Sequence, residues 1–331
     1  MKTIGKLSAM LFLAVSLLAA CEPQEARKPP DKVSVQLRWV HQAQFAGFYL
    51  AQERGYYAKE NIKVALIEGG PGIDNIEKVV TGGADFAVGG PESILLQCSQ
   101  GKPVVAIAAI YRRSPVVFAA MANSGIERPT DFLGKRIALA GVIELELQFK
   151  AMLNKLGLDI NQVKVVPHSY DLTRLREGKV DGMGLYSIGG VIRLRQAGYQ
   201  VNLIWPGDYG IHMYGYTVIT TDRMIAENPD LVTRFLRATL LGWHEAIEDT
   251  EAAVTITLKY AREKDSELQT RMMEVSVPLI HTGEDRIGWM RSGIWASTHQ
   301  ILLEQGLLEG PLYPDQVYTM EFLQKIYGEK K

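Results

Sequence analysis

The chain has 331 residues, which is enough for roughly two or three domains at about 100–200 residues each. Hydrophobic residues make up 47% and charged residues 22%, a composition that excludes a disordered or collagen-like chain. Lys and Arg number 36 against 37 Asp and Glu, so no basic excess points to a nucleic-acid partner. The 2 cysteines are too few for a disulfide framework or a cysteine-rich zinc site.

The N-terminus has the pattern of an export signal. Lys2 and Lys6 precede the apolar run MLFLAVSLLAA, which is too short to cross a membrane as a helix of about 20 residues. The order Leu-Ala-Ala-Cys that ends at Cys21 resembles the bacterial lipobox, in which the cysteine is acylated. We therefore predict a signal peptide at 1–20, a polar tether at 21–31 and a lipid-anchored protein, exported across the inner membrane to the periplasmic face or the cell surface. An ordinary signal peptide that happens to contain a cysteine is the alternative.

Strand and helix patterns alternate through the first part of the mature chain. In VSVQLRW, at 33–39, every second residue is apolar, as expected of a strand. Further strands are expected at 62–67, 85–89, 104–110, 116–121, 136–140, 163–167, 181–186, 201–205 and 216–220. Helices are expected at 43–54, 74–81, 91–100, 143–156, 171–177 and 188–197. This rhythm predicts an α/β protein with parallel sheets.

After about residue 220 the pattern becomes helical. Asn228-Pro229 and Thr282-Gly283-Glu284 are typical helix starts. Helices are expected at 222–227, 229–248, 250–262, 265–273, 284–305 and 316–327. The remaining cysteine, Cys98, falls on the apolar side of an earlier helix, where we expect it to be buried and unreactive.

No catalytic motif is found in the sequence. The 6 histidines form no HExxH or other close metal spacing, and there is no GxSxG elbow, Walker A loop or GxGxxG fingerprint. We therefore predict that the protein is not an enzyme and that it holds neither a metal nor a cofactor.

Aromatic and polar side chains instead recur where strands are expected to end. In parallel α/β sheets, ligands bind outside the carboxyl ends of the strands. Aromatic faces suit a planar ring, while carboxylates and amides suit its polar edge. Core packing is the alternative for any single aromatic residue. The candidate ligand-binding residues are Trp39, Gln42, Gln44, Glu92, Tyr111, Glu144, Tyr186, Tyr209 and Tyr214.

Long stretches of the sequence resemble a known family. They include LRWVHQAQFAGFYLAQERGYYAKENIKVALIEGG, GGADFAVGGPESIL and DYGIHMYGYTVITTDRMIAENPDLVTRFLRATLLGW. They are similar to periplasmic solute-binding lipoproteins of ABC transporters, of the type that binds thiamine-pyrimidine precursors, and the similarity covers about 32–325. The resemblance implies a two-lobed, type II Venus-flytrap α/β fold whose cleft closes on ligand. Lobe 1 would combine 32–113 with 216–331, and lobe 2 would be 114–215.

The resemblance also implies a function. The protein would be the substrate-binding component of an ABC importer, with permease and ATPase subunits as partners and a small planar heterocycle, first a thiamine pyrimidine precursor, as ligand. A riboflavin- or other vitamin-binding importer subunit and a ligand-presenting sensor protein are the alternatives. A related enzyme that makes the thiamine pyrimidine carries a cysteine-rich motif, which Cys98 alone does not supply.

Residue by residue, the resemblance places the ring-stacking aromatic on Trp39 and the contacts to the ligand's edge on Gln42 and Gln44. Two departures from the family pattern stand out. The run Tyr186-Ser187-Ile188-Gly189-Gly190 replaces Tyr-x-x-Asn-Glu-Pro, so that the carboxylate expected to meet a ring amine is missing. Tyr216 stands where Asp is common. Both leave room for another planar heterocycle, including a flavin.

Overall fold

The computed structural model describes residues 28–308, 312 and 316–328. The chain divides into two units, Met1–Pro30 and Asp31–Lys331. The expected signal peptide, the acylated Cys21 and most of the tether lie outside the described residues. In the part of the chain that is described, no helix has the length and apolar character needed to cross a membrane.

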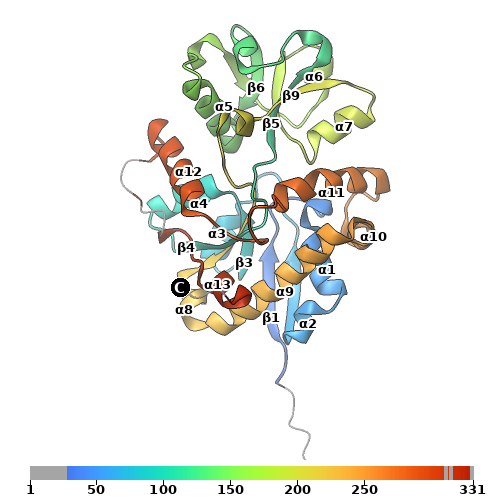
Figure 1. Ribbon diagram of the computed structural model, residues 1–331, viewed down its shortest axis with the longest axis vertical. Helices are drawn as coiled ribbons and strands as arrows, with labels where there is room; N and C mark the ends of the chain where they lie inside the picture. The colour runs from blue at the N-terminus through green and yellow to red at the C-terminus, as the bar shows by residue number, and fades with distance from the viewer. Residues whose placement is uncertain (1–27, 309–311, 313–315, 329–331) are drawn as a thin grey trace, which may run out of the picture. The chain divides into compact units, whose positions relative to one another are not determined.

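The second unit contains two separate sheets (Figure 1). The first has the order β2-β1-β3-β10-β4. Its strands are β1 (Asp31–Gln36), β2 (Ile62–Ile67), β3 (Phe86–Gly89), β4 (Val104–Ala109) and β10 (Thr217–Thr221). Strand β1 is parallel to β2 and β3, whereas β10 runs antiparallel between β3 and β4.

The second sheet has the order β7-β6-β8-β5-β9. Its strands are β5 (Val116–Met121), β6 (Arg136–Ala140), β7 (Lys164–Pro167), β8 (Gly182–Tyr186) and β9 (Val201–Ile204). Strand β6 is parallel to β7 and β8, while β5 is antiparallel to β8 and β9. Both sheets are therefore mixed, and the prediction of parallel sheets is wrong. The continuous apolar run of β4 indicates that both faces of this strand are buried. Burial alone does not determine whether neighbouring strands run parallel or antiparallel.

The chain crosses between the sheets twice, from β4 to β5 and from β9 to β10. The two crossings lie side by side: the Tyr111 N–H donates to the Tyr216 carbonyl at 3.1 Å, and the Gly215 N–H donates to the Tyr111 carbonyl at 2.8 Å. A Cβ at Gly215 would lie 2.8 Å from Cδ of Pro115, so only glycine fits between the crossings. We call the first sheet with its helices lobe 1 and the second sheet with its helices lobe 2; the residue boundaries drawn from the resemblance stay a prediction.

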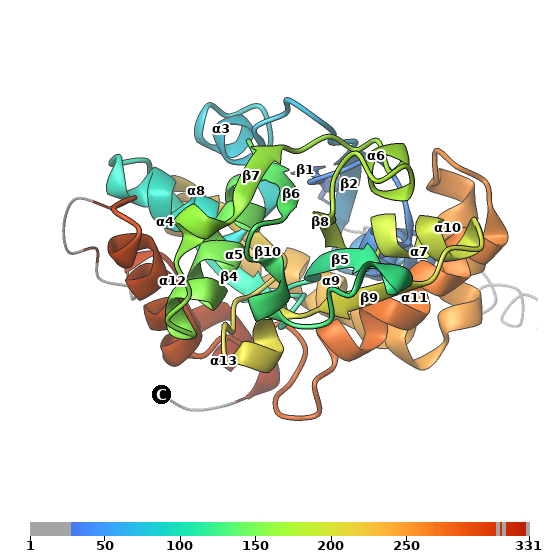
Figure 2. The same ribbon diagram turned by 90° about the horizontal axis from the view of Figure 1, so that it is seen from above.

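Helices cover both sheets. Lobe 2 carries α5 (Ile143–Lys155), α6 (Thr173–Arg176) and α7 (Gly190–Gln196). Lobe 1 carries α1 (Ala46–Glu53), α2 (Tyr56–Lys59), α3 (Asn75–Val80), α4 (Pro91–Ser99), α8 (Asp222–Glu227), α9 (Pro229–Glu248), α10 (Thr250–Tyr260), α11 (Ser266–Ile280), α12 (Ser292–Glu304) and α13 (Glu321–Tyr327). Helix α12 contacts α5 and helix α11 contacts α7, so the lobes touch on two sides of the crossings (Figure 2).

Three C-terminal helices differ from the sequence prediction. Helix α11 continues beyond 273 to Ile280, whereas α12 begins only at Ser292 and α13 only at Glu321. The segment before α12 is extended because it pairs with β4, where the Ala109 N–H donates to the Gly288 carbonyl at 2.9 Å. Strand β4 makes a second such pairing with the segment before α13. Backbone pairing with a strand therefore replaces the first expected turns of both helices.

Close packing of α1 against α9 fixes the loop that follows β1. A Cβ at Gly242 would lie 2.1 Å from the Gly47 carbonyl, and a Cβ at Gly47 would lie 2.2 Å from the Trp243 ring. Both glycines therefore permit an approach that no side chain allows. Trp243 is buried against this contact, so helix α1 and the loop before it rest on a rigid support.

Candidate ligand-binding cleft

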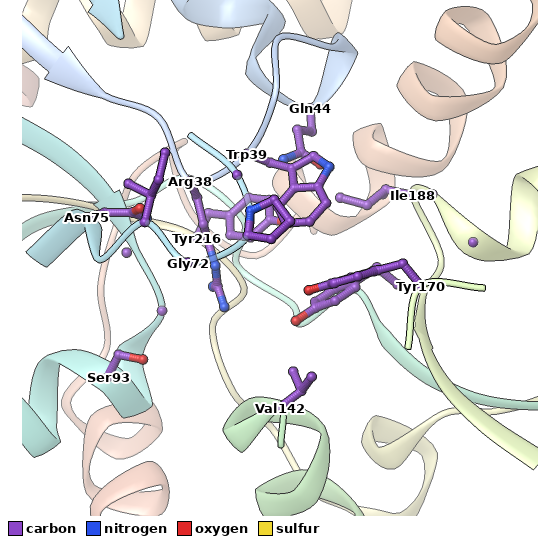
Figure 3. Close-up of a pocket in the computed structure, with 18 of the residues that line it drawn as sticks. Arg38, Trp39, Gln44, Gly72, Asn75, Ser93, Val142, Tyr170, Ile188 and Tyr216 are labelled. Atoms are coloured by element: carbon purple, nitrogen blue, oxygen red, sulfur yellow. The ribbon is translucent and has the colours of Figure 1, made fainter. Parts of the chain in front are cut away.

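A cleft of about 560 Å³ lies between the loops of the two lobes. This volume is within the range of ligand pockets, about 300–1,000 Å³. From lobe 1 and the second crossing its lining includes Arg38, Trp39, Gln42, Gln44, Asn75, Ser93 and Tyr216. From lobe 2 it includes Val142, His168, Tyr170, Leu185, Tyr186, Ile188 and Arg193. We call this space the interlobe cleft (Figure 3).

Trp39 and Tyr170, which come from different lobes, contact each other in the lining of the cleft. The sequence predicted Trp39 as the last residue of the first strand. Strand β1 ends at Gln36, however, so Trp39 lies in the loop beyond it. The Trp39 carbonyl accepts from the Gly69 N–H at 3.0 Å, which fixes this loop. The Trp39 and Tyr170 ring centroids are 5.2 Å apart, with a tilt of 45°. At this distance the two rings touch each other, so no planar ligand fits between them, and together they give the lining an aromatic surface.

Arg38 lies at the centre of a buried charged cluster. Its Nη2 is 2.6 Å from Oε2 of Glu144 and 3.9 Å from Oε1 of Glu92. Its side chain is 21% exposed, whereas those of Glu92 and Glu144 are 0% and 1% exposed. The guanidinium also lies over the Tyr216 ring, 5.3 Å from its centroid, and the Tyr186 hydroxyl donates to Glu144 Oε2 at 3.0 Å. We call Arg38, Glu92 and Glu144 the charged triad.

The triad contains one cation and two carboxyl groups. Burial, followed by the nearby Glu144, raises the pKa of Glu92 to about 7, although Arg38 opposes this. Burial likewise raises the pKa of the Tyr186 and Tyr216 hydroxyls, so both stay neutral near pH 7. Burial lowers the pKa of His168, whose Nε2 lies 3.0 Å from the Gly184 carbonyl, and this histidine is therefore also neutral.

Gly90 makes room for the triad. A Cβ at this position would lie 2.3 Å from Glu92 Oε1 and 2.8 Å from Arg38 Nη1. Its φ is −89°, which any residue adopts, so the requirement for glycine is one of space and not of backbone conformation. This requirement arises from side chains of other segments, so a local sequence pattern does not show it.

Amide side chains supply the polar edge of the cleft. Gln42 Nε2 donates to Gln44 Oε1 at 2.6 Å, which orients the two amides. Asn75 donates from Nδ2 to the Val88 carbonyl at 2.7 Å, and its Oδ1 has no hydrogen-bond partner among the described residues. Fixed donors and acceptors of this kind suit the edge of a planar ligand.

The predicted site residues divide into three groups. Trp39, Gln42, Gln44 and Tyr186 line the cleft, and Glu92 and Glu144 lie behind Arg38. The others, Tyr111, Tyr209 and Tyr214, are not among the lining residues.

These three tyrosines have other partners. The Tyr111 hydroxyl donates to Ser276 Oγ at 2.8 Å, and the Tyr214 hydroxyl accepts from the Arg291 N–H at 2.7 Å, both inside the core. Tyr209 ends a short 3₁₀ helix and packs against the core.

Sequence reasoning missed Arg38, Asn75 and Tyr170 as lining residues. A signal existed for Arg38, because it adjoins the predicted stacking residue Trp39. Its pairing with two glutamates from other elements could not be predicted from the local sequence pattern.

Polar contacts join the two walls. Arg38 of lobe 1 pairs with Glu144 of lobe 2, and Arg193 of lobe 2 pairs with Glu263 of lobe 1 through Nη2 and Oε2 at 2.5 Å. Gln305 Nε2 of lobe 1 donates to the Leu147 carbonyl of lobe 2 at 2.9 Å. The cleft is therefore spanned by bonds at its centre and on both sides.

Two mixed sheets joined by paired crossings, with a ligand-sized cleft between them, define a two-lobed α/β binding-protein fold. The crystal structure of the periplasmic aliphatic sulphonate binding protein SsuA from Escherichia coli has this fold. It superposes with a TM-score of 0.71 over 87% of this chain and 92% of that chain, at 14% identity. The chain belongs to the NMT1/THI5-like family, whose model matches residues 42–253. The family resemblance and the two-lobed fold expected from the sequence are thus confirmed.

Three curated relatives differ in the activity that their names state. The chain is 27% identical to the riboflavin-binding protein RibY of Chloroflexus aurantiacus, over 97% of each chain. It is 25% identical to a formylaminopyrimidine-binding protein of Halalkalibacterium halodurans, over 88% of this chain and 93% of the relative. It is 24% identical to a 4-amino-5-hydroxymethyl-2-methylpyrimidine phosphate synthase of Legionella pneumophila, over 88% of this chain and 92% of the relative. This chain is therefore similar both to proteins named for binding and to one named as an enzyme.

Proposed function

We propose that the protein is the substrate-binding component of an ABC importer and captures a planar heterocycle in the interlobe cleft. The observation that carries this proposal is the contacting pair of aromatic rings, Trp39 and Tyr170, in the lining of a cleft of about 560 Å³. Stacking between aromatic rings is favourable beyond the burial of area, and fixed amides at the edge supply orientation. Closure of the lobes on the ligand would provide the remaining contacts.

Among planar heterocycles, we place a fused-ring ligand of the flavin type before the single-ring thiamine pyrimidine precursor. Tyr186 and Tyr216 add two further aromatic residues to the lining. The carboxylate that would meet a ring amine after Tyr186 is absent, and the relative named for riboflavin aligns over nearly the whole chain. The pyrimidine precursor is the second candidate, supported by the relative named for formylaminopyrimidine.

Catalysis is not part of the proposal. Cys98 does not line the cleft, its thiol lies 3.1 Å from the Val104 carbonyl, and burial raises its pKa to about 11. It therefore offers no thiolate to a bound ligand. Incubation with pyridoxal phosphate and other candidate substrates, followed by product analysis, tests this point, and turnover would refute it.

For location, we propose export to the periplasm or cell surface and anchoring through acylated Cys21. A permease and an ATPase would be the partners, and a membrane receptor would replace them if the protein were a ligand-presenting sensor. Gene neighbours distinguish these two partners: an adjacent permease and ATPase pair favours import, and an adjacent receptor gene favours sensing.

The ligand is tested directly by titrating the purified protein with riboflavin, formylaminopyrimidine and unrelated vitamins. A ligand at a hundred times its dissociation constant should raise the free energy of unfolding by about 2.7 kcal/mol. Small-angle scattering at saturation should show compaction if the lobes close. The absence of binding by any planar heterocycle would refute the proposed function.

A further inference from the structure

We propose that Glu92 and Glu144 are specificity-determining residues, which cancel the charge of Arg38 so that the cleft accepts an uncharged heterocycle and rejects its phosphorylated or sulfonated counterpart. This inference rests on the proposed function and narrows its ligand class. Neither glutamate lines the cleft, so both would act through Arg38 and not by touching the ligand.

Arg38 is the group to which an anionic ligand would be drawn. Guanidinium groups bind phosphate and sulfonate oxygens through paired hydrogen bonds, and Arg38 is partly exposed at the cleft. Its Nη2, however, already donates to Glu144 at 2.6 Å, and Glu92 lies behind it. With both carboxyl groups ionised the triad carries a net negative charge, and with one of them protonated it is neutral.

Displacing either glutamate from Arg38 would be unfavourable. Glu92 Oε2 and Glu144 Oε1 already have no hydrogen-bond partner within the described part of the chain. Both side chains are almost completely buried. An anion that took Arg38 for itself would leave two buried carboxyl groups without their cation, which is strongly destabilising.

Three of the helix N-termini at the cleft also carry acidic residues. Helix N-termini attract anions, because their free N–H groups carry partial positive charge. Asp74 caps α3 and accepts from the N–H groups of Ile76 and Glu77. Glu92 lies in the first turn of α4 and Glu144 in the first turn of α5. Each of these three termini therefore has an acidic residue of the protein beside it, whereas the N-terminus of α7, where Gly189 and Gly190 line the cleft, has none in its first turn.

The other cation in the lining is paired as well. Arg193 donates to Glu263 at 3.2 Å and 2.5 Å, and His168 is neutral because burial lowers its pKa. Among the described lining residues, every arginine thus has a carboxylate partner, and Asp74 adds a negative charge. Among the described lining residues no cationic side chain is left unpaired for an anion, although the fold is shared with a protein named for binding aliphatic sulphonates.

The test compares riboflavin with riboflavin 5′-phosphate on wild-type protein, Glu92→Gln, Glu144→Gln and the double variant, by calorimetric titration at pH 8. We expect wild type to prefer riboflavin by at least about tenfold. The variants should reduce this ratio by about tenfold, mainly by gaining affinity for the phosphate. Glu77→Gln is the matched control, because Glu77 on helix α3 also pairs with a cation, Lys102, but lies outside the lining, and it should leave the ratio unchanged.

Glu92→Gln keeps the Arg38–Glu144 bond between the lobes. It can therefore test the inference alone if Glu144→Gln does not fold. Methanesulfonate, which does not titrate near neutral pH, is the second probe. Its affinity for wild type should rise from pH 8.5 to 6 as Glu92 gains a proton, and it should change little in Glu92→Gln. The titratable groups facing Glu92 are Arg38, Glu144 and Tyr216. Over this range the arginine stays charged and Tyr216 stays neutral, as does Tyr186, which bonds to Glu144.

Equal affinity of wild type for riboflavin and its phosphate, or an unchanged ratio in the double variant, would overturn the inference and leave the proposed function standing. If no heterocycle binds wild type, the proposed function fails and methanesulfonate decides the inference alone. A gain of methanesulfonate binding in the double variant would then support charge cancellation, and the lack of a gain would overturn it.

Discussion

Replacing Trp39 by alanine should weaken ligand binding much more than it destabilises the fold. The indole is only partly buried, lies in the loop after β1 and faces the Tyr170 ring at 5.2 Å. Aromatic pairs contribute about 0.5–1.5 kcal/mol beyond buried area, and lost apolar contact adds about 25 cal/mol per Å². We therefore expect a loss of at least about 1.4 kcal/mol in binding, or tenfold in Kd.

The fold should lose less than about 2 kcal/mol, because a truncation of a fully buried tryptophan costs about 3–5 kcal/mol and Trp39 is not fully buried. Trp243→Ala supplies the comparison, since Trp243 is 1% exposed and packs against Phe48 and Tyr111. That variant should show the full core penalty. Trp39→Phe retains a smaller stacking face and should bind with intermediate affinity.

Urea denaturation and calorimetric titration of the same preparations separate the two effects. If Trp39→Ala loses about 3–5 kcal/mol of fold stability while its folded fraction binds ligand normally, Trp39 is a core residue and the reasoning is wrong. Tryptophan emission provides a check before mutation, because a ligand stacked on an indole should change it.

Other predictions concern Tyr170, the charged triad and the lipid anchor at Cys21. Tyr170→Ala should weaken binding severalfold and change stability by less than about 0.5 kcal/mol, because Tyr170 is 56% exposed; titration and denaturation test both. Gly90→Ala should cost about 1–3 kcal/mol in urea denaturation, since its Cβ would collide with Glu92, whereas Gly207→Ala meets no atom within 4 Å and should be tolerated. Burial raises the pKa of Glu92 from 4.5 to about 7, so the folded state binds more protons than the unfolded state between these values. Stability should therefore fall as the pH rises from about 4.5 to 7, and less steeply in Glu92→Gln; unchanged slopes would contradict this. Cys21→Ser should release the protein from membranes or block its processing, as fractionation would show, and a variant that stays processed and membrane-bound would refute the lipoprotein prediction.

Local patterns were enough to predict most elements of the fold, but not how they pair. The apolar runs at β2, β3 and β4 mark strands because burial and strand spacing are properties of short segments. Strand direction depends on where the chain returns, and β10 enters the first sheet from lobe 2, antiparallel to both neighbours. The same limit explains α12, whose expected first turns pair with β4 instead.

The site was predictable where one loop builds it. Trp39, Gln42 and Gln44 lie within six positions of each other, so a single resemblance identified all three as candidates, and all three line the cleft. Tyr111 was also placed at a strand end, but its hydroxyl bonds to Ser276, 165 positions away, inside the core. A tyrosine at a strand end is equally compatible with either location, and only the tertiary partner distinguishes them.

In the proposed function, the bond between Arg38 and Glu144 connects the selection of ligand to the closure of the cleft. Arg38 belongs to lobe 1 and Glu144 to lobe 2, whereas Glu92 shares a lobe with Arg38. In the proposed cycle, opening separates Arg38 from Glu144 but leaves it beside Glu92. An anion that binds Arg38 in the open state then competes with Glu144 for the same guanidinium and opposes closure. An uncharged ring does not compete, so the lobes close over it. A ligand shifts the equilibrium between the open and the closed cleft only by the difference in its affinity for these two states. In this proposal, the triad makes that difference depend on the charge of the ligand.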